Sequence, residues 1–414
     1  MCQKNINNNP ARDKAAKLMS YYRNPSPLEL VYLPLNTPTH SPLVMEIVIE
    51  GSGNLDLDLW KKAANTAAQA NPGYHLKLAG TWAFKHWDDA GPLPKVIKIE
   101  TDWDGMSSEG APHAGDPIDL RNEPAVEIIL MDGPIQRVLF RVHHCIADGQ
   151  ALFHWIREVY RCLRGEQPLG SNGKETDWEI AQRFEHPERI VREGDCLPVS
   201  PKSTNVGERG CGWLRMDWKG NQSKIVPKLI LASSRVAKHF NGEGRRVFRV
   251  PSDLRRLLDK DAPFTTSNAT GAIDLELNDD STIDSIREAI IKGQQEKIDL
   301  SVFSDKLKFV RWLPSRLFKT NPKHLRAVHE KGLYGMSGTV SVLGRMKMED
   351  YSCPDFSASK VHSLPIAFEY RPLFLCVSIN PAEITASIGM PKALANQEQL
   401  LEVRERLMWE LDQL

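Results

Sequence analysis

The sequence is 414 residues long, enough for two or three domains of ordinary size or for one enzyme built from two packed lobes. Apolar residues make up 41%, charged residues make up 26%, and 53 lysines and arginines balance 53 aspartates and glutamates. This composition argues against a disordered tail protein and against a general nucleic-acid binder.

The amino-terminal stretch MCQKNINNNPARDKAAK lacks the apolar core of a signal peptide, so Cys2 is not expected to be a lipoprotein cysteine. Seven scattered cysteines without a C-x-x-C pair argue against a disulfide framework or a zinc ribbon and indicate a reducing compartment. No run approaches the roughly 20 apolar residues that cross a bilayer. We therefore expect a cytoplasmic protein without a transmembrane segment.

Residues 43–51, LVMEIVIEG, are rich in β-branched side chains and predict a strand. The following DLDLWKKAANTAAQANPG predicts a helix that ends at Pro72-Gly73. The buried face of this helix is expected to carry Leu59, Ala63, Ala67 and Ala70. PKVIKIET, residues 94–101, predicts a second strand, so the order is strand, helix, strand.

Residues 125–131, AVEIILM, and 135–144, IQRVLFRVHH, flank Asp132-Gly133 and predict a β-hairpin. Side chains alternate along a strand, so two faces of the second strand can be assigned. One face carries Val138, Phe140, Val142 and His144, and the other carries Arg137, Leu139, Arg141 and His143. The two adjacent histidines are therefore expected to point in opposite directions.

Residues 151–166, ALFHWIREVYRCLRGE, have the clearest amphipathic pattern in the chain and predict a helix that stops at Gly165. Residues 166–226 lose this periodicity and gather Gly, Pro, Ser and charged residues. We therefore predict a mixed α/β chain with an amino-terminal lobe at 1–175, a crossover at 176–226 and a carboxy-terminal lobe at 227–414.

The second half repeats the mixed pattern. RRVFRV predicts a strand, and PSDLRRLL predicts a helix capped by Ser252 with Asp253 in its first turn. GTVSVLG predicts a further strand, and FEYRPLFLCVSIN with ITASIGM predicts a hairpin around Asn380-Pro381. NQEQLLEVRERLMWEL predicts a last helix capped by Asn396. Its apolar stripe consists of Leu400, Val403, Leu407 and Leu411.

The stretch HHCIADG, residues 143–149, lies between a predicted buried strand and the start of the amphipathic helix. In a purely structural interpretation, Asp148 is a helix cap, Gly149 is a turn residue and the histidines are ordinary strand residues. A metal site is disfavoured, because His143 and His144 alternate across the strand and no third ligand stands at a telling spacing. A nucleophilic Cys145 is also disfavoured, because neighbours at a strand end diverge.

The catalytic interpretation gives each motif residue a task. A histidine held at a strand end titrates near neutral pH and can take a proton from a hydroxyl or an amine, which suits His144. Free N–H groups at the helix start around Gly149 can stabilise an oxyanion at a thioester or ester carbonyl, and the missing Cβ lets a substrate come close. Asp148 is expected to pair with an arginine and to fix the loop.

HHCIADG followed by an amphipathic helix resembles the HHxxxDG motif of the CoA-dependent acyltransferase superfamily. This superfamily includes chloramphenicol acetyltransferases, condensation domains of nonribosomal peptide synthetases, polyketide-associated acyltransferases, and wax-ester and alcohol acyltransferases. The resemblance implies two chloramphenicol-acetyltransferase-like α/β lobes in a V with a tunnel between them. It also implies His144 as general base, His143 as a supporting histidine, Asp148 as the structural acid and Gly149 beside the reacting carbonyl.

A second segment, Ser341-Val342-Leu343-Gly344-Arg345, resembles the S-N-L-G-R segment of alcohol acyltransferases and polyketide-associated relatives, with Val342 in place of the usual asparagine. The resemblance implies that Ser341, Gly344 and Arg345 belong to the substrate-binding site. Ser341 would face the tunnel, and Arg345 is one candidate partner for Asp148. The alternative is an ordinary core strand with an ordinary turn.

Two other features bear on the substrate. Positive charge gathers at residues 245–256, which could meet CoA phosphates or an acidic carrier protein, or could form a solvated face. The arginines concerned are Arg245, Arg246, Arg249, Arg255 and Arg256. The polar segment 264–268, FTTSN, could line a channel or form a loop.

The resemblance implies transfer of an acyl group from a CoA or carrier-protein thioester to an alcohol or amine, in lipid or secondary metabolism. The expected partners are acyl-CoA or an acyl carrier protein and the acceptor, with no bound metal or redox cofactor and no nucleic acid. A monomer suffices, since each lobe supplies half of the active site. Two alternatives are a stand-alone condensation-type enzyme of nonribosomal peptide synthesis and a catalytically silent homologue that binds carrier proteins.

Overall fold

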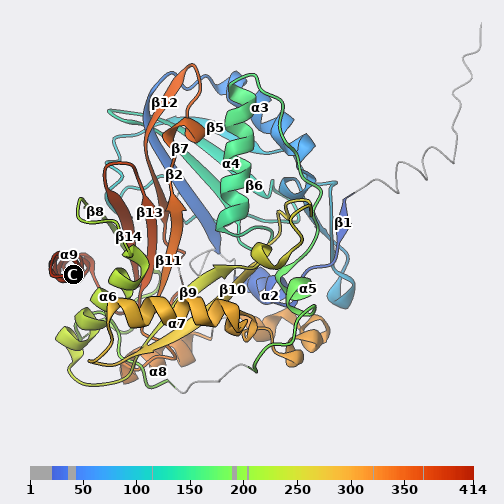
Figure 1. The fold of residues 1–414 in the computed structure, drawn as a ribbon. Coiled ribbons are helices and arrows are strands. Elements are labelled where there is room, and N and C mark those ends of the chain that lie inside the picture. Colours follow the sequence, from blue (N-terminus) through green and yellow to red (C-terminus); the bar gives the residue numbers. More distant parts are fainter. Residues whose placement is uncertain are drawn as a thin grey trace, which may run out of the picture.

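The computed structural model describes residues 21–35, 43–113, 115–188, 194–202, 205–319, 321–366 and 368–414. Two large sheets with their helices make up most of it, so the predicted mixed α/β class is confirmed (Figure 1). The amino-terminal stretch around Cys2, where no signal peptide is expected, lies outside the described residues. None of the described helices is long and apolar enough to cross a membrane.

The first sheet has the strand order β12-β2-β7-β6-β5 and is antiparallel except between β5 and β6. Its strands are β2 (Val44–Gly53), β5 (Lys95–Glu100), β6 (Val126–Asp132), β7 (Gln136–His143) and β12 (Phe356–Leu364). Helices α3 (Leu57–Ala70) and α4 (Gly149–Leu163) pack together on one of its faces (Figure 1). Trp60, Phe140 and Tyr160 fill the core between the helices and the sheet.

The second sheet has the order β10-β9-β11-β13-β14-β8. Its strands are β8 (Cys211–Trp218), β9 (Arg246–Asp253), β10 (Thr270–Leu277), β11 (Gly338–Arg345), β13 (Phe374–Ile379) and β14 (Ile384–Pro391). The accompanying helices are α6 (Ile225–Asn241), α7 (Ile283–Gln295), α8 (Pro322–Lys331) and α9 (Gln397–Asp412). Short elements complete the described fold: β1 (Tyr22–Arg23), α2 (Pro27–Tyr32), β3 (Lys77–Ala79), β4 (His86–Asp88) and α5 (Asp177–Ala181).

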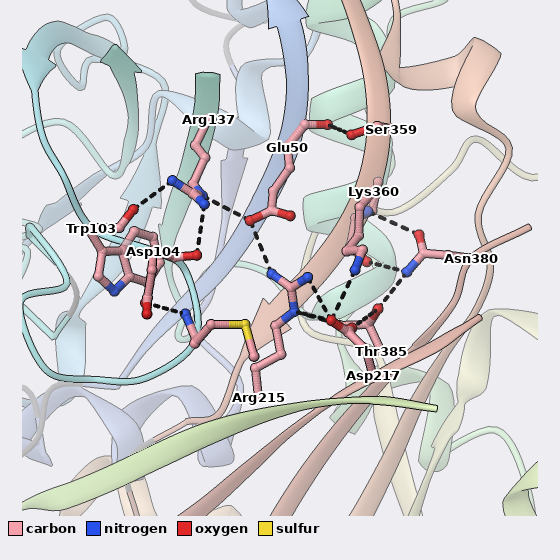
Figure 2. Close-up of polar contacts among 12 residues, drawn as sticks. Glu50, Trp103, Asp104, Arg137, Arg215, Asp217, Ser359, Lys360, Asn380 and Thr385 are labelled. Carbon is pink, nitrogen blue, oxygen red and sulfur yellow. Dashed lines mark hydrogen bonds and ion pairs between the residues drawn. The ribbon is translucent and has the colours of Figure 1, made fainter. Parts of the chain in front are cut away.

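Charged side chains join the two sheets, as Figure 2 shows. Nη1 of Arg215 on β8 donates to Oε1 of Glu50 on β2 at 3.0 Å, and Nε of Arg137 on β7 donates to the same oxygen at 2.8 Å. Asp217 on β8 accepts from Nζ of Lys360 on β12 at 3.0 Å. These groups are largely buried, and each one faces an opposite charge, so the network joins β12, β2 and β7 of the first sheet to the edge strand β8 of the second.

Most predicted elements are confirmed close to their expected bounds. The 126–143 hairpin has the predicted alternation, since Val138, Phe140 and Val142 enter the core beneath α3 and α4, whereas Leu139 enters a separate cluster. Gly165 follows α4 with a φ of 76°, a left-handed conformation that suits the predicted helix stop. Asn396 caps α9 as expected, and its predicted stripe is buried.

Three local predictions are wrong. The buried face of α3 is built on Trp60, Ala63, Ala64, Ala67 and Ala68, whereas Leu59 is 36% exposed. Residues 251–258 form no α-helix: β9 runs on to Asp253, which caps a short 3₁₀-helix at Leu254–Leu257.

The third wrong prediction is the loss of periodicity over 166–226, since β8 lies there as an edge strand of the second sheet. Strand β12, from the predicted carboxy-terminal lobe, is in turn an edge strand of the first sheet. The division into 1–175, 176–226 and 227–414 stays a prediction.

Candidate active site

The HHCIADG segment lies in the turn between β7 and α4 (Figure 1). The N–H of His144 donates to the carbonyl of Leu43 at 2.9 Å, and the N–H of Ile146 donates to the carbonyl of His143 at 3.1 Å. Cys145, Ile146 and Ala147 are fully buried. The turn is therefore fixed from both sides, and its conformation sets the direction of the two histidine side chains.

The backbone of the turn fixes the tautomer of His144. Its Nδ1 lies 2.9 Å from the carbonyl oxygen of Ala147, which can only accept, so Nδ1 carries the hydrogen and Nε2 is the basic nitrogen of the neutral ring. Burial lowers the pKa of His144 below its usual value of 6.5, so the ring is neutral at pH 7. This state and geometry fit the task of a general base.

His143 and Cys145 support the turn. Nδ1 of His143 accepts the N–H of Cys145 at 3.1 Å, and burial lowers the pKa of His143 to about 3, so it remains neutral. Sγ of Cys145 donates to the carbonyl of Glu29 at 3.4 Å, and burial raises the pKa of this thiol, which keeps it protonated. Among the described residues, no three His, Cys, Asp or Glu side chains are arranged to hold a metal ion.

Asp148 pairs with Arg255, not with Arg345. Nη1 of Arg255 donates to Oδ2 of Asp148 at 2.9 Å, and both side chains are more than nine-tenths buried. Arg345 is exposed and donates to Oε1 of Gln222, so its proposed pairing with Asp148 is wrong. Asp148 also accepts the N–H groups of Ala151 and Ala269, at 2.9 and 2.8 Å. These hydrogen bonds connect the HHCIADG segment, which follows β7 of the first sheet, to residues that precede β10 of the second sheet.

The segment 264–268 surrounds the guanidinium group of Arg255. Nε and Nη2 of Arg255 donate to the carbonyls of Thr265 and Ser267 at 2.9 and 2.7 Å, and the guanidinium lies 4.7 Å from the ring centroid of Phe264. Of the two interpretations of this segment, a channel lining or a loop, these contacts fit the loop. Its carbonyls and ring hold the arginine that anchors the motif.

The other arginines of the 245–256 run are also engaged within the chain. Arg245 pairs with Asp195 and Glu276, Arg246 with Asp279, Arg249 with Asp274, and Arg256 with Asp299. Every member of this run therefore has a carboxylate partner within the chain, and its role toward CoA phosphates or an acidic carrier protein stays a prediction.

The Ser341–Arg345 segment lies against the motif through Leu343. β11 contains a bulge between Val342 and Gly344, where the φ of Gly344 is 104°. Leu343 packs against the core of the first sheet, and Val342 packs against the core of the second. Ser341 and Gly344 are half-buried. The segment thus meets the motif as expected, and the substrate-binding roles of Ser341, Gly344 and Arg345 stay predictions.

Gly149 lies where the start of α4 approaches Leu343 of β11. Its φ is not positive, so its backbone does not require glycine. A Cβ added there would lie 3.2 Å from Cδ2 of Leu343. What glycine provides at this position is therefore space between the start of α4 and β11.

Replacing Gly149 by alanine is expected to preserve or slightly raise the thermal midpoint, because alanine favours a helix and Leu343 can shift. Turnover of a thioester substrate is expected to fall by roughly ten- to hundredfold, because the methyl group occupies the place assigned to the reacting carbonyl. The control is the double variant Gly149→Ala/Leu343→Ala, which removes the contact with Leu343. Full recovery in that variant would assign the loss to Leu343 and contradict a carbonyl site at Gly149.

Tyr32 of α2 is a site residue that the sequence did not reveal. Its ring centroid lies 5.4 Å from that of His144, and burial raises the pKa of its phenol to about 12, so the ring is an uncharged wall beside the base. A cavity of about 550 Å³ opens near this wall and reaches His143. Its lining includes Leu33, Pro34, Lys85, Arg121 and Ser315.

Comparison with solved structures identifies the fold. A mutant of the starter condensation domain of rhizomide synthetase RzmA, in complex with C8-CoA and Leu-SNAC, is 13% identical, covers 97% of this chain and 96% of its own, and superimposes with a TM-score of 0.64. The first condensation domain of the CDA synthetase is 12% identical over 95% of each chain, with a TM-score of 0.63. The condensation domain of the monacolin K polyketide synthase MokA is 11% identical over 94% of this chain and 96% of its own, with a TM-score of 0.57.

No protein-family model and no curated protein matches the sequence. The chain therefore has the condensation-domain fold along nearly its whole length, at a sequence identity that establishes the fold alone. The fold expected from the HHxxxDG resemblance is confirmed.

Proposed function

We propose that the chain is an acyltransferase that moves an acyl group from a CoA or carrier-protein thioester to an alcohol or amine. The observation that carries the proposal is the hydrogen bond from Nδ1 of His144 to the carbonyl of Ala147, which leaves Nε2 as the basic atom in the turn. The RzmA domain that shares the fold was solved with C8-CoA and Leu-SNAC, which supports a thioester as the donor.

In the proposed reaction, the oxygen or nitrogen of the acceptor attacks the thioester carbonyl while Nε2 of His144 takes the acceptor's proton. The carbonyl oxygen becomes an oxyanion at the start of α4. The N–H of Ala151 is occupied by Asp148, and we assign the N–H groups of Gly149 and Gln150, with the hydroxyl of Ser341, to this oxyanion. Collapse breaks the carbon–sulfur bond, and the thiolate recovers the proton from His144.

Asp148 acts on this reaction through its position. Burial opposes its charge, but the Arg255 guanidinium and the N–H groups of Ala151 and Ala269 hold the pKa of its carboxyl below the usual range. It is therefore ionised at neutral pH and fixes the end of the turn that carries His144. No metal or redox group is assigned a step.

The pH dependence follows from the low pKa of His144. The neutral ring is the active form, so the rate with an alcohol acceptor is expected to be level above pH 6.5 and to fall by at most tenfold per pH unit below the lowered pKa. An alcohol is specified because its own proton does not titrate in this range. A rate that rises as the pH falls through this region would contradict a neutral His144 as base.

The function is tested by thiol release from a panel of acyl-CoAs and acyl carrier proteins, with pooled alcohols and amines. Release that requires an acceptor supports acyl transfer. Turnover of carrier-bound but not CoA-bound donors would assign the chain to the stand-alone condensation type. Absence of release with every pair, together with tight binding of a carrier protein, would overturn the proposal in favour of a silent binding homologue.

A further inference from the structure

Six large apolar side chains are exposed where short segments from the first and second halves of the chain lie next to each other. They are Trp82 and Phe84 of η3 (Trp82–Phe84), Phe309 and Trp312 of η6 (Asp305–Trp312), Leu313, and Leu317 of η7 (Ser315–Phe318); we call them the apolar patch. The ring centroids of Trp82 and Trp312 lie 6.1 Å apart, which joins the two halves of the patch. Phe309 and Trp312 share a face, since residues three apart eclipse in a 3₁₀-helix.

The side chains of the apolar patch are exposed to solvent, while the inner side of the same segments is buried. Exposed fractions run from 42% at Leu313 to 72% at Phe84, whereas Val310, on the inner side of η6, is buried. α2 packs against η6 and η7 from within. Transfer of this much aromatic and aliphatic surface out of water would be favourable, so the patch needs a partner.

Positive charge surrounds the patch. Residues 305–319 carry five lysines and arginines against one carboxylate, a net charge of +4 in a chain whose total charge is zero. Lys306, Lys308, Arg316 and Lys319 are exposed and lie within η6 and η7 or directly after them. A partner that covers the apolar patch therefore has to be anionic.

We propose that the apolar patch and its lysines and arginines form an interfacial binding face for an anionic lipid surface. Trp, Phe and Leu side chains enter the boundary between headgroups and acyl chains, and lysines and arginines meet the lipid phosphates. A second copy of the chain bound at the same face would bring two segments of net charge +4 together. Protein interfaces are depleted of lysine, whereas residues 305–319 hold three lysines and two arginines.

The face lies beside the cavity that reaches His143. Ser315 of η7 and Lys85, which follows η3, line this cavity, and Leu317 and Phe84 belong to the patch. A chain bound through the patch would therefore hold the cavity at the lipid surface. The binding itself does not depend on acyl transfer, and the test below uses no turnover.

The test is co-sedimentation of the full chain with vesicles of phosphatidylcholine, with and without phosphatidylglycerol. We expect binding that requires phosphatidylglycerol, weakens with added salt, and falls about tenfold or more in Trp312→Ala and again in Trp312→Ala/Leu317→Ala. Lys306→Gln/Lys319→Gln should weaken binding to the anionic vesicles and leave the patch intact. The matched control is Trp409→Ala, which removes a tryptophan that is 50% exposed on α9, a helix packed on α6 and β8.

All substituted side chains are exposed, so the variants should have the same melting temperature as the native protein, which a thermal melting curve checks. Equal binding to both kinds of vesicle, or no binding to either, would overturn the proposal. It would also be overturned if Trp312→Ala left vesicle binding unchanged and instead abolished binding to an acidic carrier protein or a concentration-dependent dimer.

Discussion

Replacing His144 by alanine is expected to reduce acceptor-dependent thiol release by about a hundredfold to ten-thousandfold, the range that a positioned general base contributes. Alanine removes Nε2 and leaves the acceptor's proton without a base. The side chain is half-buried at the end of β7, and the turn keeps its backbone hydrogen bonds to Leu43 and His143. The affinity for the acyl donor should therefore change far less than the rate.

The pH profile of this variant gives a second readout. Whatever rate remains should no longer fall as the pH drops below the lowered pKa of His144, because the titrating group is gone. His324→Ala is the matched control, since it removes an exposed histidine from α8. A His144→Ala variant that keeps both the native rate and the native acid limb would exclude His144 as the base.

Replacing Arg255 by methionine is expected to lower the free energy of unfolding by about 3 kcal/mol, at the lower end of the range for breaking a buried ion pair. The carboxylate of Asp148 would stay buried with only the donors of Ala151, Ala269 and Thr270. The carbonyls of Thr265 and Ser267 would also lose their donor. Since Asp148 fixes the turn, turnover should fall together with stability; urea unfolding and thiol release measure the two.

Two further variants separate charge from packing. In Asp148→Asn the amide oxygen can keep the cap on α4, but the amide nitrogen then faces the N–H of Ala269 and cannot accept it. Arg255 still pairs with Asp253 at 2.9 Å, so this change is expected to cost roughly 2 kcal/mol. Asp148→Asn/Arg255→Met should be less destabilised than the two separate losses added together, because no carboxylate is left unpaired. Strict additivity would contradict this account. Arg249→Met is the control, because its pair with Asp274 is more exposed and contributes less.

The sequence predicted the turn and its flanking elements because the features that determine them lie close together in the chain. The alternation of β7, the stripe of α4 and the cap at Asp148 all lie within a few residues of the motif. The partner of Asp148 lies 107 residues away, in an arginine run whose every member binds a carboxylate, and nothing near the motif distinguishes Arg255 from Arg345. Tyr32 was missed for a similar reason, since α2 has six residues and shows no periodicity.

Two of the three wrong predictions could have been avoided from patterns in the sequence. In α3, positions 60, 63, 64, 67 and 68 follow the helical repeat if Trp60 is taken as the first buried residue in place of Leu59. In β8, Leu214, Met216 and Trp218 alternate with Arg215 and Asp217. The two charges suggested a solvated linker, but they pair with Glu50 and Lys360 between the sheets (Figure 2). Strand periodicity was therefore the better guide than charge.

The most direct test of the account compares acceptor-dependent thiol release by the native chain and by His144→Ala, at one pH above 6.5, with the donor and acceptor that the panel identifies. The account predicts release by the native protein and a loss of at least about a hundredfold in a folded variant that still binds the donor. Release at the same rate in both proteins would contradict it.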